Sequence, residues 1–326
     1  DSYNTAVGGG AGRQVTTGTN NTLIGALAGD ALTDADLNTA VGYQALSSDT
    51  LGSRSTAMGQ GSLFSQNFTT ATDTYNTAYG FHSGLSITTG FQNVLLGGLA
   101  GDALTDADYN VAIGTGALGS DTLGSRSVAI GNGSLTAQNF TTATDAYNVA
   151  VGFNAGVAVT TGIYNTLIGG AAGDALTDAD ENVAIGFNTL TTDVLGSKST
   201  AVGRGALAIQ NFTTATDSHN TAVGYFAGVN NGAGISNSFI GSQSGQASTG
   251  GNYNVAVGHL ALATDKIGHN TTAIGYFALA NQNNTTSTNA YNTAVGSSAG
   301  GAITFGVQNT IVGALAGDAM TTGDSN

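Results

Sequence analysis

The chain contains no cysteine, proline or tryptophan among its 326 residues. Without cysteine there is no disulfide framework, thiol chemistry or cysteine-ligated zinc. Charge is scarce too: only 8% of residues are charged, and 6 basic residues stand against 20 acidic ones, giving a formal net charge of −14. Nucleic acid and anionic membranes bind clustered lysine and arginine, so we expect neither as a partner. No apolar run is long enough to cross a bilayer, so we expect no membrane insertion.

What the chain has instead is a short repeat, first seen as Asn4-Thr5-Ala6-Val7-Gly8, which occurs eighteen times. The intervals between its closing glycines run 17, 17, 17 and 21 residues and then begin again, so four copies form a larger unit of 72 residues. A fixed period this short is typical of a solenoid, in which each turn buries its apolar face against its neighbours. The 51 glycines recur periodically, which excludes a disordered glycine-rich linker.

Each copy is predicted to contain a short strand, because seventeen residues leave no room for a helix and a return, and β-branched residues favour strands. Side chains alternate along a strand, so Thr5 and Val7 share one face while Ala6 and Gly8 share the other. We predict that the Thr/Val face lies inside the coil and that the Ala/Gly face is an outer wall. The predicted fold is an all-β parallel solenoid of about 18 coils, forming one elongated domain over residues 1–326.

Neighbouring copies of the repeat differ from one another in a fixed order. The strand begins with Asn in three copies of four and with Ser or Thr in the fourth, and stacked Asn side chains predict a hydrogen-bonded ladder; the alternative is that Asn only forms turns. The position four residues after the closing glycine is Gly in two copies and then Leu in two, as in Gly12, Gly29, Leu46 and Leu63. In the second copy of each group of four, the residue two positions before the closing glycine is larger than Ala. These residues are Leu23, Leu95, Leu167, Phe239 and Ile311.

The repeats at residues 38–46, 182–186 and 220–225 resemble the head repeats of trimeric autotransporter adhesins of the YadA type and the related repeats of bacteriophage tail fibres. The resemblance covers all eighteen copies. It implies a left-handed β-roll, three copies of which pack side by side around an axis. We therefore expect a homotrimer, and we expect residues 1–326 to be a segment of a longer fibre whose caps and anchor lie outside it.

Acidic residues gather in one turn of each of the first three larger units. Three carboxylates within seven residues could supply the oxygen ligands of Ca²⁺, the one cofactor that the sequence suggests. The spacing is not that of an EF-hand, and the alternative is a solvated turn in which Asp caps backbone N–H groups. The candidate ligands are Asp30, Asp34, Asp36, Asp102, Asp106, Asp108, Asp174, Asp178 and Asp180.

A second acidic series begins with Asp49 and is followed five residues later by Arg54 and its equivalents. We expect a surface ion pair of little energetic value.

The four extra residues of every fourth copy are predicted to form a protruding loop, a candidate surface for lateral contacts or receptor binding. Some of its Asn residues lie in Asn-x-Thr glycan acceptor sequences. The alternative is a spacer loop with a Phe tucked beneath it. The candidate contact residues are Asn67, Phe68, Asn139, Phe140, Asn211 and Phe212.

Nothing in the sequence indicates an enzyme. The four histidines occupy different phases of the repeat, and Glu181 is the only glutamate, so no acid–base site recurs. We expect a structural fibre segment of a phage tail fibre or an extracellular microbial surface appendage, serving attachment to a host or surface through a glycan or protein receptor. The alternative is a self-polymerising filament subunit that stacks head to tail.

Overall fold

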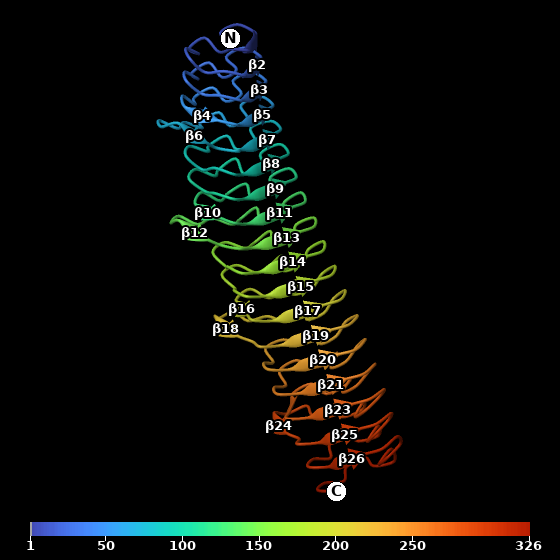
Figure 1. Cartoon of the computed structure of the whole chain (residues 1–326). Coiled ribbons are helices and arrows are strands. Elements are labelled where there is room, and N and C mark those ends of the chain that lie inside the picture. Colours follow the sequence, from blue (N-terminus) through green and yellow to red (C-terminus); the bar gives the residue numbers. More distant parts are fainter. Residues whose placement is uncertain (1) are drawn as a thin grey trace. The chain divides into compact units, whose positions relative to one another are not determined.

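The computed structural model describes residues 2–326 and divides into two compact units, Asp1–Thr161 and Gly162–Asn326. Each unit is a stack of coils with a three-residue strand in each coil, and each strand pairs in parallel with the strand of the next coil of its unit (Figure 1). The described residues contain no helix. The prediction of a parallel β-solenoid with about 18 coils is therefore confirmed.

The first unit builds its sheet from one strand per coil: β1 (Thr5–Val7), β2 (Thr22–Ile24), β3 (Thr39–Val41), β5 (Thr56–Met58), β7 (Thr77–Tyr79), β8 (Val94–Leu96), β9 (Val111–Ile113), β11 (Val128–Ile130) and β13 (Val149–Val151). The second unit repeats the arrangement with β14 (Thr166–Ile168), β15 (Val183–Ile185), β17 (Thr200–Val202), β19 (Thr221–Val223), β20 (Ser238–Ile240), β21 (Val255–Val257), β23 (Thr272–Ile274), β25 (Thr293–Val295) and β26 (Thr310–Val312). In register, Thr5 lies beside Thr22 and Val7 beside Ile24, so equivalent positions of the repeat form continuous rows.

The prediction of which strand face is buried was wrong. From β2 onward the middle residue of each three-residue strand is in the core, as for Ala40, which is fully buried, whereas Ile24 and Tyr79 on the other face are 40% and 57% exposed. In the first strand, β1, all three residues are exposed. The physical reason is the thinness of the coil. Its interior is already occupied by Leu side chains from the turns, such as Leu46, so only a small residue fits at most middle positions.

The alternation of Gly and Leu after the strand follows from the same lack of space. Gly12, Gly29, Leu46 and Leu63 all have φ between 50° and 57°, so backbone conformation does not decide which residue stands there. A Cβ atom on Gly12 or Gly29 would lie 2.7 Å from a Cδ atom of Leu23. The larger middle residue, which occurs in one coil of every four, therefore requires the two glycines that flank it.

The Asn residues form the predicted ladder, mainly through backbone groups. The Asn21 side-chain oxygen accepts a hydrogen bond from the N–H of Asn38 in the next coil, at 2.9 Å, and its amide nitrogen donates to the carbonyl of Ala35, at 2.7 Å. The same two bonds recur at Asn93, whose oxygen accepts from Asn110. Each Asn thus ties its coil together and links it to the next one without water.

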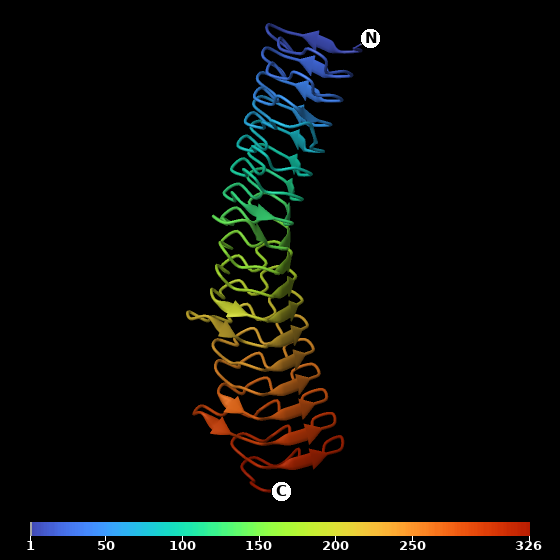
Figure 2. The ribbon, with the colours of Figure 1, turned by 60° about the vertical axis from the view of Figure 1, so that its left-hand side comes forward.

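The four-residue insertions form protruding loops, each of which ends in a two-residue strand that pairs with a two-residue strand of the preceding coil. These pairs are β4 (Gly52–Ser53) with β6 (Thr72–Asp73), β10 (Gly124–Ser125) with β12 (Thr144–Asp145), β16 (Gly196–Ser197) with β18 (Thr216–Asp217), and β22 (Gly268–His269) with β24 (Thr288–Asn289). Figure 2 shows the loops that lead into β18 and β24 standing out from the neighbouring coils of their unit. The prediction of a longer loop at this place is confirmed.

Candidate functional site

The structure does not bring the three carboxylates of an acidic turn together. Asp30 pairs with Arg13 at 3.0 Å and accepts a hydrogen bond from the Ser47 hydroxyl. Asp34 accepts from the Thr17 hydroxyl, and Asp36 from the backbone N–H of Thr19 at 2.6 Å. Among residues 2–326, no three His, Cys, Asp or Glu side chains are grouped so as to hold a metal ion. Each carboxylate instead links one coil to a neighbouring coil.

The equivalent turns follow the same scheme. Asp106 accepts from the Thr89 hydroxyl at 2.6 Å, Asp108 from the N–H of Phe91 at 2.9 Å, and Asp180 from the N–H of Ile163 at 2.8 Å. Burial raises the pKa of Asp108 and Asp180, as it does for Asp102. Desolvation is the largest cause for all three, and it outweighs the backbone N–H donors that lower the pKa. The two remaining candidates are Asp174, which accepts from the Thr191 hydroxyl, and Asp178, which also has an interaction partner.

The interpretation of Asp49 as half of a surface ion pair was wrong. Asp49 is fully buried, and one of its oxygens accepts from the backbone N–H groups of Gly52 and Phe68, both at 3.0 Å. Its other oxygen accepts from the Gln66 amide at 2.5 Å, and the Gln66 oxygen in turn accepts from Asn76 at 2.9 Å. The network joins the coil below the insertion to the coil above it. It recurs around Asp121, Asp193 and Asp265.

This network also explains why the fourth coil begins its strand with Ser. Ser55 has no side-chain carbonyl to continue the Asn ladder, and the Gln66 amide donates to its hydroxyl at 2.9 Å. The Gln66 oxygen accepts from the side-chain amide of Asn76, while the backbone N–H of Asn76 donates to the Thr74 hydroxyl instead of to a ladder oxygen. Burial raises the pKa of Asp49, Asp193 and Asp265, because the cost of removing the carboxylate from water outweighs the N–H donors that lower it.

Arg54 pairs with a residue of the insertion rather than with Asp49. Its Nε lies 2.9 Å from Oδ1 of Asp73, and both side chains are about half exposed. The pair recurs as Arg126 with Asp145 and as Lys198 with Asp217. In the fourth loop two asparagines replace both partners together: the Asn270 amide donates to Asn289 at 3.0 Å. The fourth loop therefore keeps a side-chain contact at this place, but the two partners are uncharged.

At the loop itself the structure separates the candidate contact residues into two groups. Asn67, Asn139 and Asn211 are exposed. Phe68, Phe140 and Phe212 are buried beneath the loop, at 6–7% exposure. Only the Asn and the neighbouring Thr side chains can therefore touch a partner while the loop keeps this conformation.

The feature that the sequence analysis missed is the strand face, defined as the first and third residues of the three-residue strands. Its third-position side chains are Val, Ile, Leu, Met or Tyr throughout the described residues. Many remain open to water, among them Ile24, Tyr79, Ile168, Ile185, Ile240 and Ile274. Soluble proteins seldom leave such a contiguous apolar strip uncovered.

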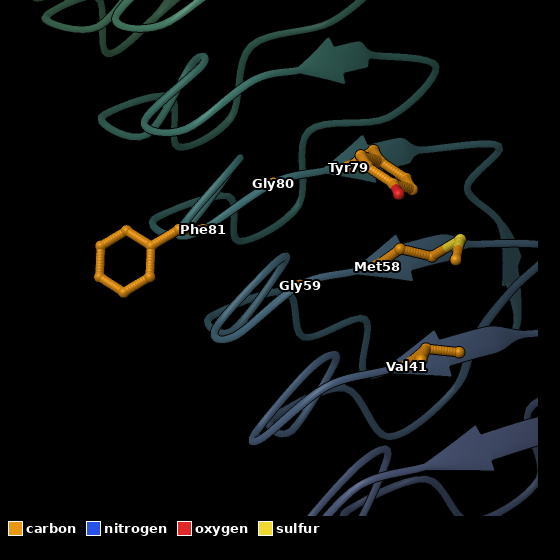
Figure 3. A pocket seen from close by; sticks show the side chains of 6 residues that line it. All are labelled: Val41, Met58, Gly59, Tyr79, Gly80 and Phe81. Carbon is orange, nitrogen blue, oxygen red and sulfur yellow. The ribbon is translucent and has the colours of Figure 1, made fainter.

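A row of exposed rings borders the strand face. We call it the aromatic edge: the residues directly after the closing glycines, which include Tyr43, Phe81, Phe153, Phe187, Tyr225 and Tyr276. Between edge and face lies an open hollow lined by Val41, Met58, Gly59, Tyr79, Gly80 and Phe81. Figure 3 shows Val41, Met58 and Tyr79 pointing to one side from successive strands, while Phe81 extends away from them beyond Gly80. The edge is therefore a surface separate from the strand face.

The edge carries a cation in the second unit. The Arg204 guanidinium carbon lies 6.0 Å from the ring centroid of Phe187, 5.9 Å from that of Tyr225 and 5.6 Å from that of Phe226. A Cβ on Gly205 would lie 2.3 Å from the Phe226 ring, so this glycine makes the space in which the ring packs. In unit 1 the equivalent place of Arg204 is held by Gln60, between Tyr43 and Phe81.

In comparisons with known proteins, no protein-family model matched the chain and no curated protein was significantly similar to it. Within residues 2–326 there is no helix with the length and apolarity needed to span a bilayer.

Proposed function

We propose that this chain is a structural fibre segment, part of a phage tail fibre or of an extracellular microbial surface appendage, and that it serves attachment to a host or surface. In this proposal copies of the chain associate through the strand face. The observation that carries it is the exposure of that face along each unit, with Ile24 and Ile240 at 40% and 42%.

Burial of the strand face against a second copy removes apolar surface from water. An exposed Ile or Val gains about 25 cal/mol for each Å² of apolar surface removed from water, and a continuous row of them adds up along the sheet. The register keeps Ile168 beside Ile185 and Ile185 beside Val202, so the row presents a regular apolar surface that a second copy can match side chain by side chain. The resemblance to adhesin heads favours three copies around an axis.

The mechanical role follows from continuity. Within a unit every coil is hydrogen-bonded to its neighbours through the strands, the Asn ladder and the Asp–Gln network, so a pull along the stack is shared among many bonds. Such an object suits a shaft or a display scaffold better than it suits catalysis.

The mass of the purified chain in solution tests the association. Light scattering over a range of concentrations, with and without a calcium chelator, is expected to give three times the chain mass at every concentration. Ile185→Lys, on the strand face, is expected to reduce that mass to a single chain, whereas Thr213→Lys, in an exposed insertion loop, leaves it unchanged. A stable wild-type monomer would refute the proposal, and an open-ended series of sizes would replace it with the head-to-tail filament.

A further inference from the structure

We propose that the aromatic edge around Arg204 binds a linear acidic polysaccharide, one whose pyranose rings carry carboxylates. The inference rests on the attachment part of the proposed function and names the ligand class for it. The binding residues are Phe187, Arg204 and Tyr225.

The geometry supplies two stacking platforms and a cation between them. Phe187, Arg204 and Tyr225 stand at the same position of three successive coils, and backbone hydrogen bonds of 3.0 Å, from Gly205 to Phe187 and from Phe226 to Arg204, hold these coils in register. Adjacent strands lie about 4.7–4.9 Å apart, so the two rings are separated by about 9.4–9.8 Å along the stack. Alternate rings of an extended sugar chain can rest on the two side chains, which are 52% and 46% exposed.

The charge of Arg204 selects the ligand. Of the six basic residues, all within the described part of the chain, four form ion pairs with Asp; Arg204 and Lys266 do not. In a chain of net charge −14 an exposed guanidinium without a carboxylate partner is conspicuous. The planar guanidinium matches a carboxylate with two parallel N–H bonds, and its contact with the Phe226 ring keeps it at the edge.

The place of Arg204 also varies in a way that fits recognition. Gln60 occupies it in unit 1, between the exposed rings of Tyr43 and Phe81. The other two equivalent places lack such a pair of rings, since Asn132 lies between Thr115 and Phe153, and Tyr276 between His259 and Ser297. At the second pair of rings the polar group differs, as expected if the rings recognise the sugar and the polar group recognises its substituent. Arg204 then distinguishes acidic from neutral chains.

Calorimetric titration of the whole chain tests the inference, with oligogalacturonate as the acidic probe. A cello-oligosaccharide of equal length serves as the neutral probe, and an oligoglutamate as the acidic probe without sugar rings. At about 0.15 M salt, where the Debye length is about 8 Å, distant charges of the chain contribute little. We expect oligogalacturonate to bind at least about tenfold more tightly than either of the other two probes, the factor typical of one charge-assisted contact.

Three variants locate the site. Arg204→Gln, which copies the residue of unit 1, is expected to weaken oligogalacturonate binding about tenfold or more, and Lys266→Gln, which removes the same charge elsewhere, is expected to leave it unchanged. Tyr225→Leu is expected to weaken binding of both sugars. Equal effects of the Arg204 and Lys266 variants, equal binding of oligoglutamate, or no binding by the wild type would each overturn the inference. Light scattering on the same samples distinguishes failure of the polysaccharide inference from failure of the fibre proposal. A threefold mass without sugar binding would overturn the inference alone.

Discussion

The fit between Phe239 and its flanking glycines can be tested by a double-mutant cycle. Phe239 is the middle residue of β20 and is fully buried. A Cβ on Gly245 would lie 2.3 Å from both Cδ1 and Cε1 of its ring, and no other atom comes as close to that position. If the glycine is there to admit the ring, Gly245→Ala should be tolerated far better once the ring is removed.

The expected magnitudes follow from packing. Phe239→Ala removes a buried ring and is expected to cost about 3–5 kcal/mol. Gly245→Ala is expected to cost about 1–3 kcal/mol for the clash, together with about 1–2 kcal/mol because its φ of 56° is left-handed. In the double variant the clash is absent and the new methyl group fills part of the cavity, worth about 0.8 kcal/mol. The cost of the double variant should therefore fall short of the sum of the two single costs by about 2–4 kcal/mol, which is the clash no longer made plus the contribution of the methyl group.

Urea unfolding of the wild type, both single variants and the double variant measures this coupling, provided that the slope of the transition is unchanged among them. Gly116→Ala is the matched control, because Gly116 has a φ of 64° and its added Cβ would meet nothing within 4 Å. It isolates the backbone cost, expected to be about 1–2 kcal/mol. Strict additivity of the Phe239 and Gly245 variants would refute the explanation of the glycine and leucine alternation.

Three further outcomes follow from the polar contacts. Gln210→Leu is expected to lower the free energy of unfolding by about 2–4 kcal/mol, because buried Asp193 loses its amide donor and Asn220 its acceptor; an unchanged urea midpoint would contradict this. Because burial raises the pKa of Asp193 in the folded state, its contribution to stability is largest at acid pH and is lost as pH rises through that pKa; melting between pH 7 and pH 4 should show a gain on acidification that shrinks in Asp193→Asn. Replacing Arg54 and Asp73 together by Asn, as the fourth loop does, should change the melting midpoint little, since half-exposed pairs contribute about 0–1 kcal/mol; a large loss would show that the charge matters.

The period of the solenoid was predictable because its cause is local. Closing glycines such as Gly42 and Gly59 have φ of 139° and 132°, and an added Cβ would strike the carbonyl of the glycine in the next coil. Only glycine fits, so it recurs at every coil and marks the period in the sequence. The short β-branched segments before it then identify the strands.

The face of the strand was not predictable in the same way, because alternation gives two faces without saying which one is inside. We expected the larger side chains to be buried, as in a two-layered sheet. In this coil the interior is filled from the turns by residues such as Leu46 and Leu63, so the strand contributes the small residues Ala40 and Ala57. Which wall supplies the bulk of the core depends on the cross-section of the coil, and that is a property of the three-dimensional fold.

The burial of Asp49 did have a signal in the sequence. It stands 17 residues after Leu32 and 17 before Gln66, so it occupies the phase of a core residue. Charge alone favoured the surface interpretation, because isolated carboxylates are seldom buried. The partner that makes burial tolerable is Gln66, whose amide reaches Asp49 from the neighbouring coil, and that contact could only be seen once the coils were stacked.

The two apolar systems of the chain call for different explanations. The internal one consists of Ala and Leu with the glycines that make room for them, and it forms the core of each unit. The polar groups are also satisfied within the stack, because among residues 2–326 the only buried side-chain polar atom without a partner is Oδ1 of Asn283. The strand face does not contribute to this core, since Ile185 and Ile274 point away from it and stay exposed. Apolar residues kept at one position in coil after coil, where folding of a single chain does not require them, are what association between copies would require.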